Sequence, residues 1–123
     1  MPQRNATILA CLLTVGLSAG CGSEVSFQRD VNPILQKNCA ACHTAGGAGY
    51  VASGFSVASH DSVMKGTKFG PIITPGVSIS STLVLLLEGK THPSIQMPRD
   101  SKPLPPQEID LIKRWINAGA KNN

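Results

Sequence analysis

Apolar residues recur at three- and four-residue intervals between residues 27 and 35, which is the spacing of one face of an α-helix. Pro33 predicts that the regular helix begins near it, with Asn32 or Asp30 as its cap, because proline is accommodated in a first helical turn. We expect the helix to run for about two turns and to end close to Cys39. The apolar stripe consists of Phe27, Val31, Ile34 and Leu35.

The clearest periodic stretch runs from Pro106 to Ala118. Its acidic residues lie in the first turn, and Lys113 and Arg114 lie near its end, an order that suits the helix dipole. Gly119 follows, where glycine commonly ends a helix. The pattern predicts a C-terminal amphipathic helix whose apolar face consists of Ile109, Ile112, Trp115 and Ile116.

Two shorter helices are predicted between these ends. Ser59 can cap a helix that runs to Lys65 and stops at Gly66. A second helix is predicted over residues 82–88, closed by Gly89. Its apolar run faces every direction, so we expect this helix to be deeply buried or covered on two sides; a short β-strand is the alternative. The serines that could open it are Ser78, Ser80 and Ser81.

Three stretches lack a sustained period, which predicts irregular backbone. They are rich in glycine or proline, and the last of them contains the pair Met97-Pro98. These stretches are residues 44–54, 69–76 and 90–104.

The N-terminal residues have the pattern of a secretory signal peptide. Residues 1–5 are polar and carry Arg4, residues 6–17 are almost wholly apolar, and residues 18–20 are small. The apolar run is too short for an ordinary membrane-spanning helix, and a buried N-terminal helix is the structural alternative. We expect residues 1–20 to be removed when the protein is exported.

Cys21 follows directly, which resembles the lipobox of bacterial lipoproteins, where this cysteine becomes the first mature residue and is lipidated. Ser18 departs from that pattern, since an aliphatic residue is usual at its position, and ordinary signal peptidase could instead leave Cys21 as a free thiol. An exposed thiol in an oxidising compartment is prone to oxidation, which favours lipidation. Residues 21–26 would then be a tether, and residues 27–123 the domain.

Composition limits what this domain can be. It is small, and the whole chain has only 3 Phe, 1 Tyr and 1 Trp beside 12 Gly and 9 Pro, so its core needs additional stabilisation. The formal net charge is only +4, and no run of Lys or Arg is dense enough for a nucleic-acid or polybasic membrane site. The scattered lysines indicate a solvated surface or, alternatively, a docking face for an acidic protein partner.

The five residues from Cys39 to His43 carry the strongest chemical signal. Two cysteines three apart, followed directly by histidine, are typical of covalent c-type haem attachment. Two thiols on one short turn can each add to one vinyl group of the porphyrin, and the next residue can offer an imidazole nitrogen to the iron. A covalently bound porphyrin would also supply the apolar centre that the composition lacks, so we expect loss of haem to unfold most of the protein.

Cys39 and Cys42 have three alternative uses. A zinc site needs two further ligands at suitable spacing, and His60 and His92 form no paired ligand motif. A thioredoxin-like redox pair is expected in a βαβ setting, which the glycine- and proline-rich chain does not suggest. A structural disulfide suits an exported protein but leaves His43 without a role.

With these motifs in place, the chain resembles a class I cytochrome c and, more narrowly, the compact cytochrome c domains first noted in planctomycete proteins. The resemblance implies a small all-α fold in which the N- and C-terminal helices cross and loops wrap one covalently attached haem, with His43 as the proximal ligand and Met97 as the distal one. Leu104-Pro105-Pro106 departs from the family, where a Ser or Thr cap is common. The matching stretches are 27–35, 39–43, 81–84, 97–98 and 112–120.

Four side chains could supply the sixth iron ligand. Met97 is favoured because it lies in a proline-bounded loop between two helices, where Pro98 restricts the backbone. His92 is the main alternative, since it lies five residues away in the same loop. Met64 is expected to pack in the core, and His60, next to a helix cap, is expected at the surface. An open sixth position is the remaining alternative.

These observations predict a monohaem electron carrier, not an enzyme, on the outer face of a bacterial membrane. No pair of carboxylates and no nucleophile with its base stands out in the sequence, and an iron with six ligands has no place for a substrate. The expected partners are redox proteins, not nucleic acid, and the expected membrane attachment is a lipid on Cys21. The alternatives are a gas sensor or peroxidase-like protein with an open sixth position, and a cytochrome subunit of a larger oxidoreductase.

Overall fold

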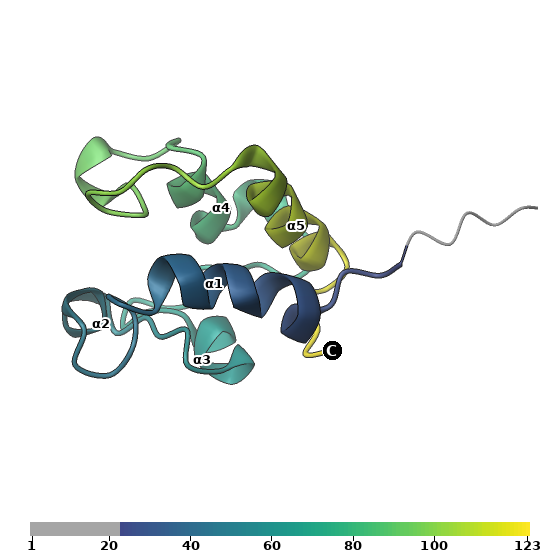
Figure 1. Ribbon diagram of the computed structural model, residues 1–123, viewed down its shortest axis with the longest axis horizontal. Coiled ribbons are helices and arrows are strands. Elements are labelled where there is room, and N and C mark those ends of the chain that lie inside the picture. Colours follow the sequence, from purple (N-terminus) through teal and green to yellow (C-terminus); the bar gives the residue numbers. More distant parts are fainter. Residues whose placement is uncertain (1–22) are drawn as a thin grey trace, which may run out of the picture.

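The computed structural model describes residues 23–123 (Figure 1). The predicted signal peptide, residues 1–20, and the predicted lipidation site, Cys21, lie outside the described residues. The described part is helical, and its only β-type pairing is an isolated bridge between Thr67 and Gly70. In chain order its elements are η1 (Phe27–Val31), α1 (Asn32–Cys39), α2 (Ala48–Ser53), α3 (His60–Lys65), η2 (Ser78–Ser80), α4 (Thr82–Leu87), η3 (Pro93–Ile95) and α5 (Pro106–Asn117).

The regular helix begins near Pro33 and ends at Cys39, as predicted, but the helical path starts earlier, with the π-helical turn η1. Ser26 is its cap, and its hydroxyl oxygen accepts a hydrogen bond from the backbone N–H of Arg29 at 3.1 Å. The expectation that Asn32 or Asp30 caps the helix was therefore wrong. Residues 27–31 form a π-helical turn that continues into α1, and Pro33 lies in the first turn of α1, where proline is tolerated. The π turn thus lets the chain be helical on both sides of the proline.

The glycine-rich stretch 44–54 contains a short helix, α2, which the sequence pattern did not predict. Gly47 precedes it, and Gly54 ends it with a left-handed φ of 76°. Hydrogen bonds from outside the helix hold it in place: the Tyr50 N–H donates to the Cys42 carbonyl at 2.8 Å, and the Lys68 N–H donates to the Ser53 carbonyl at 2.8 Å. These contacts replace the hydrophobic stripe that short helices usually need.

The other predicted helices are confirmed. The Ser59 hydroxyl accepts from the Ser62 N–H at 3.1 Å at the start of α3, and Gly66 ends that helix. The stretch predicted to be helical over 82–88 is α4, which ends one residue earlier than expected. It is a helix and not the alternative strand, and three of its six residues are buried. The last helix, α5, begins at Pro106 as predicted, without a side-chain cap.

The core joins the two ends of the domain. Phe27 in η1 and Trp115 in α5 are each 1% exposed, and their ring centroids lie 5.3 Å apart. The remaining large buried side chains come from α1, α3, α4, α5 and the segments between them, which places one continuous core between these helices. None of the helices in residues 23–123 has the length and hydropathy needed to cross a lipid bilayer.

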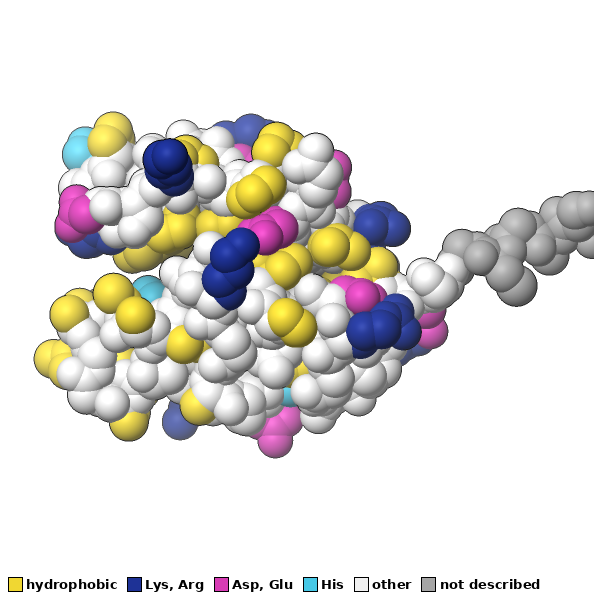
Figure 2. Space-filling view, in the orientation of Figure 1, with side chains coloured by type: hydrophobic (Ala, Val, Ile, Leu, Met, Phe, Trp, Pro, Cys, Tyr) yellow, Lys and Arg dark blue, Asp and Glu magenta, His cyan; other side chains and the backbone are white. Residues whose placement is uncertain are grey.

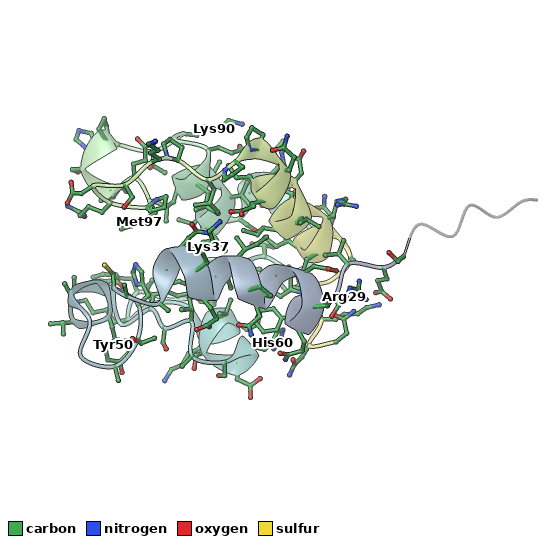
Figure 3. All side chains as sticks on the ribbon, viewed as in Figure 1. Arg29, Lys37, Tyr50, His60, Lys90 and Met97 are labelled. Atoms are coloured by element: carbon green, nitrogen blue, oxygen red, sulfur yellow. The ribbon has the colours of Figure 1, made fainter. Side chains whose placement is uncertain are left out.

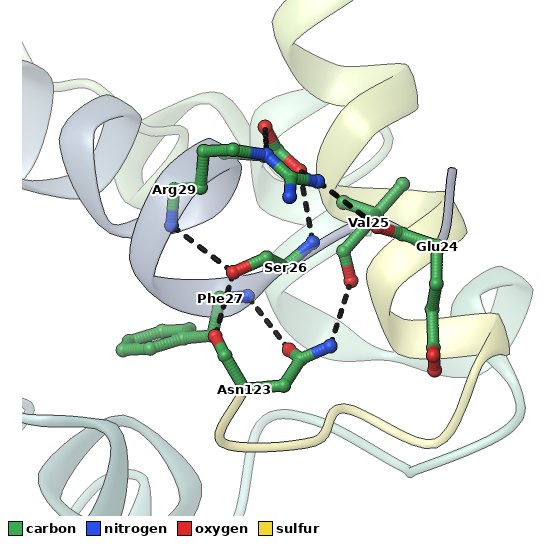
Figure 4. A network of polar contacts seen from close by, with 7 residues as sticks. Glu24, Val25, Ser26, Phe27, Arg29 and Asn123 are labelled. Atoms are coloured by element: carbon green, nitrogen blue, oxygen red, sulfur yellow. Dashed lines mark hydrogen bonds and ion pairs between the residues drawn. The ribbon is translucent and has the colours of Figure 1, made fainter.

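The last residues of the chain clasp the first turn of the domain (Figure 4). The Asn123 side chain accepts a hydrogen bond from the Phe27 N–H at 2.9 Å and donates to the Val25 carbonyl at 3.4 Å. Its backbone carbonyl accepts from the Ser26 hydroxyl at 2.6 Å and from the Gln28 N–H at 2.9 Å. The clasp satisfies backbone groups at the start of η1 that have no partner within the helix.

Candidate functional site

The five residues from Cys39 to His43 extend the helical path of α1 by one turn. The backbone N–H of Cys42 donates to the Cys39 carbonyl at 3.2 Å, and that of His43 donates to the same carbonyl at 2.8 Å. Both cysteines are free thiols; Cys39 is half-buried and Cys42 is exposed. The structure therefore brings the two thiols and the imidazole onto one compact turn, as the spacing predicted.

Burial, and secondarily the neighbouring Cys42, raise the pKa of the Cys39 thiol to about 11. Burial acts in this direction because it disfavours the charged thiolate. The raised pKa disfavours reactions of the thiolate such as disulfide exchange. Zinc would need further ligands, and within residues 23–123 no three His, Cys, Asp or Glu side chains gather in a metal-binding group.

The imidazole of His43 is held by Phe55 in a defined orientation. Its Nδ1 lies 3.3 Å from the Phe55 carbonyl oxygen. Because a carbonyl oxygen can only accept, Nδ1 carries the proton and Nε2 keeps its lone pair. The two rings also meet edge-on, with centroids 5.3 Å apart. This is the arrangement that a metal-binding histidine usually has, with one nitrogen bonded to a carbonyl and the other free to ligate.

The turn that carries His43 is attached to the following segments through the backbone. The Val57 N–H donates to the His43 carbonyl at 2.8 Å, and the Tyr50 N–H donates to the Cys42 carbonyl at the same distance. Phe55 and Val57 are buried, at 5% and 0% exposure. The core therefore fixes the segment from Phe55 to Val57, which orients the imidazole, so the position of His43 depends on tertiary packing.

Met97 lies on the segment between α4 and α5, as its position in the sequence predicted. Its side chain is half-buried and packs against the hydrophobic core, as that of Cys39 does. Figure 3 shows Met97 on one side of a gap and Tyr50 of α2 on the other. Figure 2 shows that the surface is hollowed between these two parts of the molecule, and that hydrophobic side chains and a histidine line the hollow.

The alternative ligands are engaged elsewhere. His92 is exposed and caps η3: its Nδ1 accepts from the Ser94 N–H at 3.3 Å and lies 2.8 Å from the Ser94 hydroxyl. Met64 is partly buried and packs against the core, in agreement with the prediction. Met97, by contrast, is a half-buried side chain on the proline-bounded segment between α4 and α5.

The expectation that His60 lies at the surface was wrong. Its side chain is only 13% exposed and packs edge-on against Phe27 and Trp115, with centroids 4.9 and 6.0 Å away. Its Nε2 lies 2.8 Å from the Ala120 carbonyl. Its Nδ1 is buried and has no hydrogen bond; the nearby Asp61 carboxylate oxygen lies 3.5 Å away and does not form one. His60 is thus part of the core and of the clasp region, because the C-terminal tail folds over it.

These residues fit a covalently attached porphyrin. Two free thiols on one turn, an imidazole whose Nε2 is unbonded among the described residues, and a half-buried thioether on the segment between α4 and α5 are the donor types of a c-type haem with histidine and methionine ligands. A separate depression of about 250 Å³, between Phe27, His60 and Asn122, includes none of Cys39, Cys42, His43 and Met97.

Two residues of the site could not be recognised from the sequence. Phe55 acts through its backbone carbonyl, which every residue has, so no sequence signal marks it. Gly49 packs against the His43 ring, and in a stretch with several glycines it does not stand out.

Comparison with protein-family models, with curated proteins and with solved structures finds no match to this chain.

Proposed function

We propose that the chain is a monohaem c-type cytochrome that carries electrons and adopts a class I cytochrome c fold. One observation carries the proposal: His43 bonds through Nδ1 to the Phe55 carbonyl and keeps Nε2 free, on the same turn as two free thiols. A structural disulfide would leave this orientation of His43 without a purpose, and a zinc site would need further ligands that do not gather there among residues 23–123. The helical core and the packing of α5 against η1 are compatible with the proposed fold.

Each residue has a distinct role in the proposal. Cys39 and Cys42 hold the porphyrin by thioethers, His43 binds its iron through Nε2, and Met97 is the distal ligand. When bound, the haem supplies the one-electron couple, and a methionine ligand raises its reduction potential relative to a second histidine. The chain's own contribution is to keep the two ligands in place in both oxidation states, which lowers the reorganisation that accompanies electron transfer.

The proposal also includes the location. The N-terminal pattern supports export, which fits the haem motif because bacteria complete c-type haem attachment outside the cytoplasm. Cys21 supports a lipid anchor on the outer face of the membrane. The first described residues, from Ser23, lead directly into Val25, which is 8% exposed and belongs to the core. The proposed tether would therefore be short. The proposed partners are donor and acceptor redox proteins.

The decisive experiment is to express the full chain in a bacterium that attaches c-type haem, and to stain a denaturing gel for haem. We expect a haem band that disappears when Cys39 and Cys42 are both changed to alanine. In the ferric protein, a far-red methionine-to-iron charge-transfer band should be lost in Met97→Ala and kept in the core variant Met64→Ala. A colourless wild-type product would refute the proposal.

The same preparation distinguishes the alternatives. A high-spin wild-type spectrum that shifts with cyanide or carbon monoxide would indicate a sensor or peroxidase-like protein with an open sixth position. Survival of the far-red band in Met97→Ala would assign the distal ligand to the other methionine of the domain, with Met64→Ala as the next variant. A low-spin wild-type spectrum without that band would assign the ligand to a histidine, with His92→Ala as the next variant. Stable copurification with a second chain would indicate a subunit of a larger oxidoreductase.

A further inference from the structure

Gly49 lies in the first turn of α2, where nothing in its backbone requires glycine. Its φ is outside the left-handed region, and residues 48–53 have helical backbone. Alanine is more favourable than glycine in a helix. The reason for a glycine at this position must therefore lie in its surroundings.

The surroundings of Gly49 are dominated by the His43 ring. A Cβ atom added to Gly49 would lie 2.7 Å from His43 Cε1 and 2.8 Å from His43 Nε2, and 3.0 Å from the Cys42 carbonyl oxygen. Ordinary van der Waals contact begins at 3.4 Å, so the ring or the helix would have to move by about 0.7 Å. The crowded edge of the ring contains Nε2, the nitrogen that is free to bind a metal.

The ring has little freedom to yield. Phe55 holds it at Nδ1 through the 3.3 Å contact with its carbonyl and packs edge-on against it. The backbone of the turn is tied at the His43 carbonyl by Val57 and at the Cys42 carbonyl by Tyr50. The imidazole thus sits between Phe55 and the bare backbone of Gly49.

We propose that Gly49 is a positioning residue for the iron ligand: its lack of a side chain keeps the Nε2 edge of His43 clear and sets the position of the ring. The inference rests on the proposed haem function. Metal–imidazole bonds are about 2.0–2.1 Å long, so a ring displacement of about 0.7 Å is large on that scale. Thioethers at Cys39 and Cys42 would hold the porphyrin, which could not follow the ring.

The test compares three variants of the full-length holoprotein. Gly49→Ala crowds the ring. Gly47→Ala is the matched control, because its Cβ would lie 2.5 Å from the Cys42 carbonyl oxygen but has no His43 atom among its three nearest neighbours. Val51, on the same helix, is 71% exposed, so Val51→Ala controls for changes in α2 that involve neither the His43 ring nor the Cys42 carbonyl.

Two readouts report on the iron–histidine bond itself. We expect Gly49→Ala to raise the reduction potential, because a weaker imidazole donor stabilises ferric iron less. In a Met97→Ala background, where the sixth position is open, we expect it to lower the iron–histidine stretching frequency in the resonance Raman spectrum of the ferrous protein. Val51→Ala should change neither quantity, and Gly47→Ala should change them less than Gly49→Ala.

The outcomes separate this inference from the proposed function. If wild-type protein carries no haem, the proposed function fails first. If wild-type protein carries haem and Gly49→Ala has the potential and stretching frequency of Val51→Ala, the role of Gly49 is refuted. Equal effects of Gly47→Ala and Gly49→Ala, including equal failure to mature, would assign the effect to the Cys42 backbone and also overturn the inference. Failure of Gly49→Ala alone to retain haem would support it.

Discussion

The clasp between the last residue and the first helical turn offers a quantitative test of the fold. Asn123→Ala removes the side-chain acceptor of the Phe27 N–H, at 2.9 Å, and the donor to the Val25 carbonyl, at 3.4 Å. The two bonds made by the Asn123 backbone carbonyl remain. A net hydrogen bond contributes about 0.5–1.5 kcal/mol, and the long second bond should lie at the lower end. We therefore expect a loss of about 1–2 kcal/mol.

Asn122→Ala is a matched control for this loss. Its side chain accepts a hydrogen bond from the exposed Gln28 side chain at 2.9 Å, and water can replace that bond without leaving a backbone group unpaired. We expect a change within about 0.5 kcal/mol, as for other surface substitutions.

Thermal and denaturant unfolding, followed by circular dichroism, measure both variants. For a domain of this size, each kcal/mol lowers Tm by roughly 4–8 °C, so Asn123→Ala should melt clearly below Asn122→Ala. Equal melting temperatures for the two variants would refute the reasoning, because they would mean that the N–H at the start of η1 does not need the Asn123 side chain.

Two further predictions test individual features of the structure. The Lys90 ammonium, at 2.7 Å, and the Lys113 ammonium, at 3.0 Å, hold the pKa of the Glu88 carboxyl below its usual value of 4.5. The stability that Glu88 contributes is therefore complete above about pH 4.5 and is lost as the pH falls through its lower folded-state pKa. We expect Glu88→Gln to reduce the loss of unfolding free energy between neutral and low pH, measured by urea titration. Asp61→Asn, at a side chain that is 96% exposed, should show the same loss as wild type. An unchanged loss in Glu88→Gln would contradict the ion-pair assignment. Gly66 has a φ of +79°, and a Cβ there would lie 2.5 Å from the Gly70 carbonyl oxygen, whereas Gly76 has a φ of +85° with nothing within 4 Å. Gly76→Ala should lose about 1–2 kcal/mol to its positive φ. Gly66→Ala should lose more, because its backbone (φ 79°, ψ −135°) lies outside the left-handed helical region and because of the clash; equal losses in unfolding experiments would show that the loop relaxes.

Local signals in the sequence determined most of the helices. The three- and four-residue spacing of apolar side chains located α1 and α5, and Ser59, Gly66 and Gly119 marked helix ends in the places where the structure has them. These signals work because caps and amphipathic faces depend on neighbours within one or two turns. The spacing of Cys39, Cys42 and His43 likewise determined that the three side chains share one turn, since hydrogen bonds within that turn are enough to form it.

Only the tertiary structure decided the features that depend on distant partners. The helix α2 forms in a glycine-rich stretch because Cys42 and Lys68 hydrogen-bond to it, and no periodicity records those contacts. His60 is only 13% exposed because the C-terminal tail closes over it, which cannot be inferred from its place beside a helix cap. The orientation of His43 depends on the Phe55 carbonyl and on the empty space at Gly49. A backbone carbonyl or an absent side chain is not marked by any distinctive residue type. The sequence therefore determined which groups the site contains, whereas the packing of the folded chain decided which imidazole nitrogen is available.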